Sequence, residues 1–228
     1  PVEKKGNIYV CHTYYHVFVS FLKELNLPKE EQGTAELVLS SVSNDFDNLA
    51  DRVRAGKVFC RAYDFEEKKD EFFPEVMKYK TDRGNIVSNM FSRIIYTRKF
   101  ARAEAPYIPV DFSEYRNIYV YCDSDPIGIY LNQNHIPYHA MEDGLNYLKP
   151  YIAAKYDNRG HFGLKKFFSM DLNLIFIRDG YSKYCLDMEV NDLGVVDDVF
   201  EKYREEIKNN LFHHTLTIKM PDKNNIFE

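Results

Sequence analysis

The sequence predicts an α/β fold, in which a Rossmann-like and mostly parallel sheet is flanked by helices. Short β-rich runs alternate along the chain with segments whose apolar residues recur every three or four positions, which is the spacing of one helical face. The clearest strand is 117–123, and the short β-rich run at 7–11 is expected to be a central strand. Because strand, helix and strand in succession form a parallel βαβ unit, this alternation favours a parallel sheet.

The same periodicity places each element in order. We expect strands at 7–11, 36–42, 57–62, 117–123, 136–141 and 173–178. We expect helices at 14–25, 46–54, 86–100, 126–131 and 196–207. Thr13 is suited to cap the first helix, Gly56 to end the second and Pro126 to begin the fourth. The mixed-charge run 66–71 is predicted to be a solvated loop or helix face.

The helix expected at 86–100 is basic in its C-terminal half and beyond, where Arg93, Arg98, Lys99 and Arg102 lie. Such cations can complement the partial negative charge of a helix C-terminus. They can also steer an anionic sugar or nucleotide toward a site. We favour the first interpretation.

Composition and charge exclude several classes of protein. The 228 residues are 45% hydrophobic and 29% charged, which is typical of one globular domain or of one domain with part of another. A net charge of −5 argues against general nucleic-acid binding, which needs a basic surface. No apolar run approaches the ~20 residues of a membrane-spanning helix. The four cysteines form no CxxC pair, so we expect a cytoplasmic protein in a reducing compartment.

Acidic turns follow two consecutive predicted strands. The strand at 117–123 leads into Asp123-Ser124-Asp125, and the strand at 136–141 leads into Glu142-Asp143-Gly144. The carboxyl ends of parallel strands share one edge of a sheet, where open α/β folds bind ligands. These carboxylates are therefore expected to line one cleft. The alternative is that Ser124 or Asp125, and Asp143, only cap the helices that follow.

The histidines near the first strand raise the question of a metal. His12 and His16 are four residues apart, but a zinc site of this spacing normally has a glutamate after the first histidine and a third ligand elsewhere. We interpret His16 as a packed or hydrogen-bonded side chain, and His12 and Thr13 as contacts of a ligand. Two carboxylates around a helix that begins with proline, as Asp123 and Asp125 are, more often cap it than bind an ion. No metal is predicted.

Three segments resemble the bacterial sialyltransferases of glycosyltransferase family 52, which include lipooligosaccharide and capsule sialyltransferases. They are 7–16, the Tyr121-Cys122-Asp123 strand end, and His139-Ala140-Met141-Glu142-Asp143-Gly144. The last contains the D/E-D/E-G motif, the most specific part of the match. The resemblance covers most of the chain. It implies a GT-B architecture of two Rossmann-like domains facing a cleft, with this chain as the N-terminal, acceptor-side half.

The resemblance implies an inverting transfer of sialic acid from CMP-sialic acid to a sugar hydroxyl of a bacterial surface glycan. Asp143, the second acid of the motif, would deprotonate that hydroxyl, which is too weak an acid to attack the anomeric carbon unaided. The leaving group is a nucleotide monophosphate, so neither a cofactor nor a metal is expected. Supporting or substrate-binding roles are expected for Glu142, Gly144, Asn146, His12, Thr13, Tyr14, Asp123, Ser124 and Asp125.

The family also carries a His-Pro motif in its second domain, and this sequence contains no His-Pro pair. We therefore expect 1–212 to be the acceptor-side domain and 213–228 a linker toward a donor-binding domain, with the chain alone weakly active or inactive. The expected partners are the nucleotide-sugar donor and the glycan acceptor. We expect a monomer or a homodimer, in the cytoplasm or at the inner face of the cell membrane. A GT-B transferase with another nucleotide-linked donor and a non-catalytic α/β binding domain are the alternatives.

Overall fold

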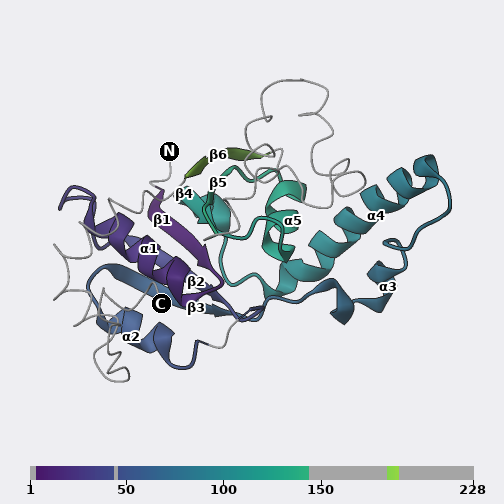
Figure 1. The fold of residues 1–228 in the computed structure, drawn as a ribbon. Helices are drawn as coiled ribbons and strands as arrows, with labels where there is room; N and C mark the ends of the chain where they lie inside the picture. Colours follow the sequence, from purple (N-terminus) through teal and green to yellow (C-terminus); the bar gives the residue numbers. More distant parts are fainter. Residues whose placement is uncertain (1–3, 44–45, 144–183, 190–228) are drawn as a thin grey trace, which may run out of the picture.

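A computed structural model of the chain describes residues 4–43, 46–143 and 184–189 (Figure 1). Within these residues six strands form one sheet in the order β3-β2-β1-β4-β5-β6. Every pair of neighbouring strands is parallel. The predicted α/β class, a parallel sheet flanked by helices, is confirmed.

The strands are β1 Lys5–Cys11, β2 Ala35–Ser40, β3 Phe59–Phe65, β4 Tyr115–Val120, β5 Tyr138–Met141 and β6 Cys185–Glu189. The α-helices are α1 Tyr14–Leu25, α2 Leu49–Ala55, α3 Pro74–Met77, α4 Ile86–Glu104 and α5 Pro126–Gln133. Turns of 3-10 helix lie at Asp70–Phe72, Ala105–Tyr107 and Phe112–Glu114. Each strand and helix expected before residue 143 has a counterpart, displaced by a few residues at its ends.

Several predictions concern residues outside the described part of the chain. They are the strand at 173–178, the helix at 196–207, the linker at 213–228, and the roles of Gly144 and Asn146. Conversely, the sequence does not predict β6. Its residues include no β-branched or aromatic side chain, and Leu186 is 61% exposed beside a buried Cys185, so the usual strand signal is weak at this edge of the sheet.

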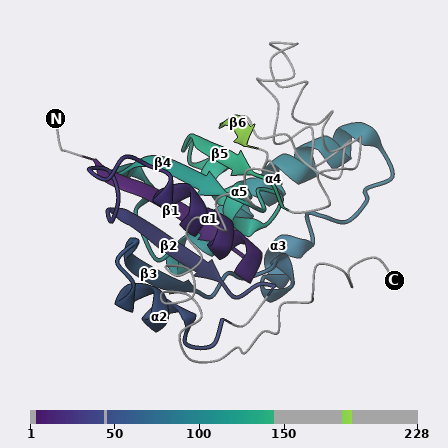
Figure 2. The same ribbon diagram turned by 60° about the vertical axis from the view of Figure 1, so that its left-hand side comes forward.

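Helices cover both faces of the sheet. Successive side chains of β1 enter different cores: Tyr9 and Cys11 pack on the side of α1 and α2, and Ile8 and Val10 on the side of α5. All four are 0% exposed, as expected of a central strand in a parallel sheet. Figure 2 shows α1 and α5 on opposite faces. A third and smaller core joins α4 to α5.

The connectivity reverses at β1. The chain runs from β1 outward to β2 and β3, and then crosses to β4, β5 and β6 on the other side. The loops that leave β1 and β4 therefore diverge, and this point at the carboxyl edge is where open α/β sheets bind ligands. His12 follows β1 here, Cys122 follows β4, and Asp143 follows β5.

The helix ends agree only in part with the predicted caps. Thr13 caps α1, because its Oγ1 accepts the N–H of His16 at 3.2 Å. Gly56 is the C-cap residue of α2, and Pro126 is the first residue of α5. Asp125 occupies the N-cap position of α5, but its side chain makes no capping hydrogen bond. That expectation is wrong, because another carboxylate takes the place, as described below.

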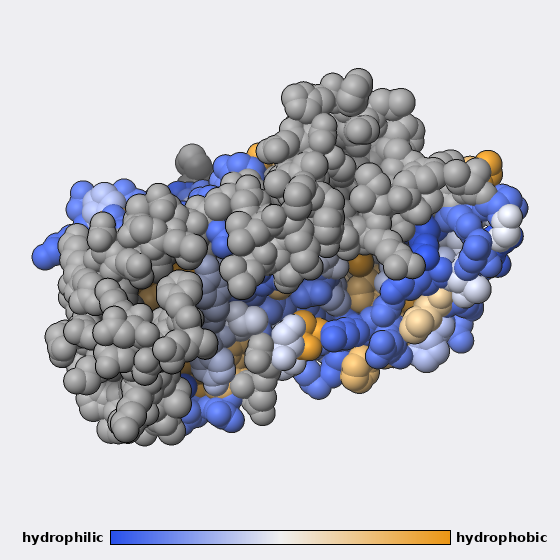
Figure 3. Space-filling model, viewed as in Figure 1, coloured by the Kyte–Doolittle hydropathy of each residue, from blue (hydrophilic) through white to orange (hydrophobic). Residues whose placement is uncertain are grey.

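The basic residues of α4 lie in different surroundings. Only Arg102 lies in the last turn, so the helix-dipole interpretation applies to it alone. Arg93 lies over the Tyr96 ring, 5.9 Å from its centroid. The surface over α3 and α4 is largely hydrophilic with scattered apolar spots (Figure 3). None of the helices in the described residues is both long and apolar enough to cross a membrane.

Gly128, in the first turn of α5, should tolerate no side chain. A Cβ there would lie 1.9 Å from the carbonyl oxygen of Asp123, and backbone cannot move aside cheaply. Gly128→Ala should lower the free energy of unfolding in urea by ~3 kcal/mol or more, the upper end of over-packing costs.

Gly84→Ala is the matched control for that substitution. Gly84 has φ +79° but no described atom within 4 Å of an added Cβ. Its cost should stay near the ~1–2 kcal/mol of a left-handed alanine. An equal loss of unfolding free energy in both variants would contradict the close approach of α5 to the turn after β4.

Candidate functional site

Polar side chains gather at the carboxyl ends of β1, β3, β4 and β5. His12 follows β1, His16 lies in the first turn of α1, Glu67 follows β3, and Asp125 and Asp143 follow β4 and β5. Asp125 lies 3.7 Å from the His12 ring, and Asp143 lies 2.7 Å from the His16 ring. The acids expected at the two strand ends therefore both reach one pair of histidines.

His16 holds the Asp143 carboxylate. Its Nε2 lies 2.7 Å from Oδ1 of Asp143, and its Nδ1 lies 3.0 Å from the backbone nitrogen of His12. A backbone N–H can only donate, so Nδ1 must be unprotonated, and Nε2 carries the proton that is donated to Asp143. The ring stacks on Tyr121 with centroids 4.2 Å apart. His16 is thus hydrogen-bonded, as expected, and fixed in one tautomer.

The pair carries its charge on Asp143. Burial lowers the pKa of His16, although the hydrogen bond and charge of Asp143 act in the opposite direction, so the imidazole is neutral at pH 7. The His16 side chain is 1% exposed, whereas that of Asp143 is 43% exposed. The Asp143 carboxylate is therefore held by His16 through one oxygen while part of the side chain remains open to solvent. This combination suits a group that exchanges a proton with a bound molecule.

Contacts behind the ring secure the first turn of α1. The Ser20 hydroxyl donates to the carbonyl oxygen of His16 at 2.8 Å. Its oxygen lies 2.9 Å from the Tyr121 hydroxyl, which must then be the donor. These bonds tie α1 to the end of β4 beneath the imidazole, and the ring of Tyr121 covers one face of His16.

Glu67 joins three strand ends and a helix. Its Oε2 lies 2.9 Å from Nε2 of His12 and accepts the hydroxyl of Ser40, the last residue of β2. Its Oε1 accepts the backbone N–H of Ile127 at 2.7 Å. Glu67 thus satisfies a donor in the first turn of α5 from a distant part of the chain, which is why Asp125 does not cap this helix.

The prediction that 66–71 is solvated is wrong at Glu67, which is 4% exposed. Its neighbours Glu66 and Glu71 are exposed as expected. Glu66 and Glu67 are adjacent and look alike in the sequence. The one distinguishing signal is that Glu67 lies two residues beyond Phe65, the buried end of β3, at the edge where α/β sheets collect functional side chains.

The surroundings of His12 are acidic. Burial acts to lower the pKa of His12, but the hydrogen bond and charge of Glu67, with the charges of Asp125 and Asp143, raise it above its ordinary value. Burial raises the pKa of Asp125; His12 opposes this rise, and Glu67 and Asp143 add to it. Such a site favours cations and neutral polar groups over anions.

Cys122 is a site residue that the sequence analysis misses. Its side chain is half-buried and contacts Asp143. Burial raises the pKa of the thiol, and the carboxylates of Asp143 and Asp125 raise it further, so the thiol is protonated at neutral pH and is no nucleophile. In the sequence a cysteine at a strand end reads as a small hydrophobe. Only its place beside the acidic turn distinguishes it.

Asp123 and Ser124 have other environments. Asp123 is 6% exposed and accepts the hydroxyl of Tyr138 at 3.0 Å. Ser124 is exposed. Asp123 is thus hydrogen-bonded to a residue of β5, whereas Asp125 lies beside His12.

The remaining predicted site residues lie around the cluster in supporting positions. Thr13 caps α1. Tyr14 is 43% exposed and meets the Phe46 ring edge-on, with centroids 5.3 Å apart. Glu142 is 8% exposed, and its backbone N–H donates to Glu189 of β6 at 2.9 Å. Of these residues, Tyr14 is the most open to a ligand.

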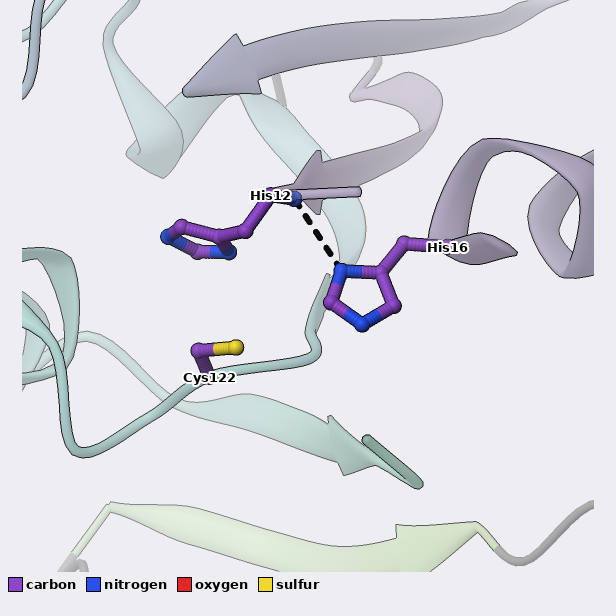
Figure 4. A group of neighbouring side chains, drawn as sticks. All are labelled: His12, His16 and Cys122. Atoms are coloured by element: carbon purple, nitrogen blue, oxygen red, sulfur yellow. Dashed lines mark hydrogen bonds between the residues drawn. The ribbon is translucent and has the colours of Figure 1, made fainter. Parts of the chain in front are cut away.

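Three of the clustered side chains could hold a metal ion. One ligand atom from each of His12, His16 and Cys122 lies within 4.8 Å of the others. Figure 4 shows the two rings and the sulfur around a common space. Imidazole nitrogen and thiolate sulfur are ligands that zinc prefers. The sequence shows the spacing of the two histidines but not the third residue, which comes from a distant strand.

A second buried acid, Glu104, lies behind Glu67 at the end of α4. It is 0% exposed, and its Oε1 accepts the backbone N–H of Lys68 at 3.0 Å. Burial raises the pKa of Glu104 to about 7; the Lys68 N–H opposes the rise, and the charge of Glu67 adds to it. This carboxyl supports the loop that carries Glu67.

Glu104→Gln should change how stability depends on pH. Because the folded pKa of about 7 exceeds the unfolded value of 4.5, the folded state binds more protons between these values, and stability falls as the pH rises through them. At ~1.4 kcal/mol per pKa unit, wild type loses ~3 kcal/mol by about pH 8. The variant cannot ionise, so in urea denaturation it should be more stable there by about this amount and similar below about pH 4.5.

Glu71→Gln removes the same charge from an exposed position and serves as the control. It should show no comparable gain at high pH. Parallel stability curves for wild type and Glu104→Gln would show that the buried carboxyl does not hold its proton in the folded state.

Comparison of the chain with models of protein families, with curated proteins and with solved structures finds no match. The candidate site therefore rests on the residues and distances given above. They form a partly exposed carboxylate held by a neutral imidazole, at the acidic carboxyl edge of a parallel sheet.

Proposed function

We propose that the chain is the acceptor-side domain of an inverting glycosyltransferase of the sialyltransferase type. The donor is CMP-sialic acid, and the acceptor is a sugar hydroxyl of a bacterial surface glycan. The observation that carries the proposal is the 2.7 Å hydrogen bond between Nε2 of His16 and Oδ1 of Asp143. It supports a general base at the motif position that resembles glycosyltransferase family 52.

In the proposed reaction Asp143 takes the proton of the acceptor hydroxyl while the hydroxyl oxygen attacks the anomeric carbon. The new C–O bond forms as the bond to the phosphate oxygen breaks, and CMP leaves with that electron pair. Attack from the face opposite the leaving group inverts the configuration. His16 keeps its proton throughout and orients the carboxylate through Nε2–H. No step uses a metal or cofactor.

The proton goes to Asp143 and not to His16, because both ring nitrogens of His16 are engaged. Nδ1 accepts the His12 N–H and Nε2 donates to Asp143. A protonated ring would place a second donor opposite the His12 N–H. Burial also works against a positive charge here, as the lowered pKa of His16 shows. His16 is therefore a positioning residue.

The charge of the site supports an acceptor-side role. Glu67, Asp125 and Asp143 contact the two histidines. The first turn of α5, which could otherwise attract a phosphate, already holds the Glu67 carboxylate. A neutral sugar hydroxyl meets no repulsion in these surroundings, whereas an anion does. The donor phosphate is then bound by groups outside this cluster.

Asp143→Asn should lower kcat by ~10²–10⁴-fold, the usual contribution of a general base, because an amide cannot accept the hydroxyl proton. The assay measures transfer from CMP-sialic acid to a glycan acceptor by the whole protein that carries this chain. The acceptor KM should change much less, since the lost interaction belongs to the transition state. Tm should stay near wild type, because the amide oxygen can still accept from His16. Glu142→Gln should have a milder effect on kcat.

Asp187→Asn is the matched control. Asp187 lies 2.7 Å from Nδ1 of His139, so the substitution alters a similar carboxylate–imidazole pair elsewhere in the sheet and should leave kcat near wild type. A near-normal kcat in Asp143→Asn would remove Asp143 from the mechanism and favour a binding domain. Turnover of a different nucleotide-linked donor would keep Asp143 as the base and change the substrate.

A further inference from the structure

Helix α4 exposes a row of apolar side chains to solvent. Val87, Phe91 and Ile95 follow one another at steps of four residues, which places them on one face of the helix. They are 57%, 59% and 40% exposed. Tyr96 and Phe100, on the opposite face, are buried. Single apolar side chains on a surface are ordinary, but three in line along one helix mark an interaction surface.

The same face becomes basic toward the end of α4. Arg98 and Arg102 continue the row at steps of three and four residues, and both are exposed. Within the described residues neither arginine pairs with an acid, whereas Lys80, before the helix, is paired with Asp70. The single acid of α4, Glu104, is 0% exposed. In a chain of net charge −5, every exposed charge of this helix is therefore positive, which favours an anionic partner.

The packed core holds this face in place. The inner side of α4 packs on α5, and the rings of Tyr96 and Phe100 stack there with centroids 5.6 Å apart. At the other end of the inner side, Glu104 accepts the backbone N–H of Lys68 at 3.0 Å. α4 lies on the side of the described structure farthest from α2 (Figure 1). The outward face is thus formed before any partner arrives.

The size and chemistry of the face fit a lipid surface better than a protein. A stable protein interface has ~20–30 residues on each side, and three apolar side chains with two arginines are far fewer. A bilayer needs no matching shape. Apolar side chains of a surface helix enter the boundary between head groups and acyl chains, and cations are attracted to anionic lipid.

We propose that α4 docks the chain on the surface of a membrane that contains anionic lipid. Val87, Phe91 and Ile95 enter the boundary between head groups and acyl chains, and Arg98 and Arg102 contact lipid phosphates. The helix lies along the membrane surface, because the row runs along its length. Docking involves neither a donor nor an acceptor, so it does not rest on the proposed function.

Sedimentation with vesicles tests the surface. The 228-residue chain should bind vesicles of phosphatidylglycerol and phosphatidylethanolamine, and it should stay in solution with phosphatidylcholine alone. Phe91→Ser should weaken binding by ~10-fold, on the order expected for burial of a large apolar side chain. Arg98→Gln combined with Arg102→Gln should weaken it by ~30-fold, since each cation near an anionic membrane contributes ~5-fold. All three side chains are exposed, so the variants should keep the Tm of wild type.

Matched controls come from exposed positions elsewhere. Leu186→Ser removes a side chain that is 61% exposed in β6, and it should bind vesicles as wild type does. Lys29→Gln combined with Lys57→Gln changes the net charge by the same amount as the arginine pair and should have little effect. Equal losses in the lysine and arginine pairs would show that net charge alone governs binding, and would overturn the assignment to α4.

Fluorescence tests insertion directly, because the chain has no tryptophan. Emission from Phe91→Trp should shift to shorter wavelength with the anionic vesicles and should be quenched by lipids brominated on their acyl chains. Leu186→Trp should show neither effect. Unchanged emission from Phe91→Trp on bound vesicles would overturn insertion. A chain that binds no vesicle, but forms a dimer that Phe91→Ser dissociates, would overturn the membrane proposal and assign the face to a second copy.

Discussion

The candidate site depends on the buried carboxylate of Glu67. A charge this far from solvent is costly unless hydrogen bonds replace its hydration. Three donors do so here: the ring of His12, the hydroxyl of Ser40 and the backbone N–H of Ile127. Removing a partner from such a buried group typically costs ~3–5 kcal/mol. One side chain thereby joins the ends of β1, β2 and β3 to the first turn of α5.

Through His12 the same carboxylate acts on Asp143. Glu67 holds the His12 ring, the His12 backbone N–H sets the tautomer of His16, and the remaining proton of His16 holds Asp143. Each of these hydrogen bonds gives a buried polar group a partner. The network ends at Asp143, whose side chain is 43% exposed. A carboxylate placed in this way is held in position without losing access to a bound hydroxyl.

Local pattern predicts β1 to β5 and the helices α1, α2, α4 and α5, because their apolar spacing and end signals are encoded locally, as with Thr13 at the start of α1. The single-turn helix α3 is not predicted, since it has too few residues to show a helical period. Because parallel strands end at the same edge of the sheet, the sequence also predicts that Asp125 and Asp143 lie near each other there, as they do beside His12 and His16. Pattern does not reveal which of two adjacent acids turns inward, as Glu67 does and Glu66 does not. That choice depends on the partner that the fold brings opposite, and His12 is far from Glu67 along the chain. Cys122 and β6 are missed for the same reason, since neither has a distinctive local signal.

The tautomer of His16 tests the account most directly, because it links the buried network to the proposed base. Long-range proton–nitrogen correlation spectra of the chain labelled with ¹⁵N in its histidine rings report which ring nitrogen carries the proton. The His16 ring should be neutral near pH 7, with Nδ1 unprotonated and Nε2 protonated. A proton on Nδ1, or a doubly protonated ring at that pH, would contradict it.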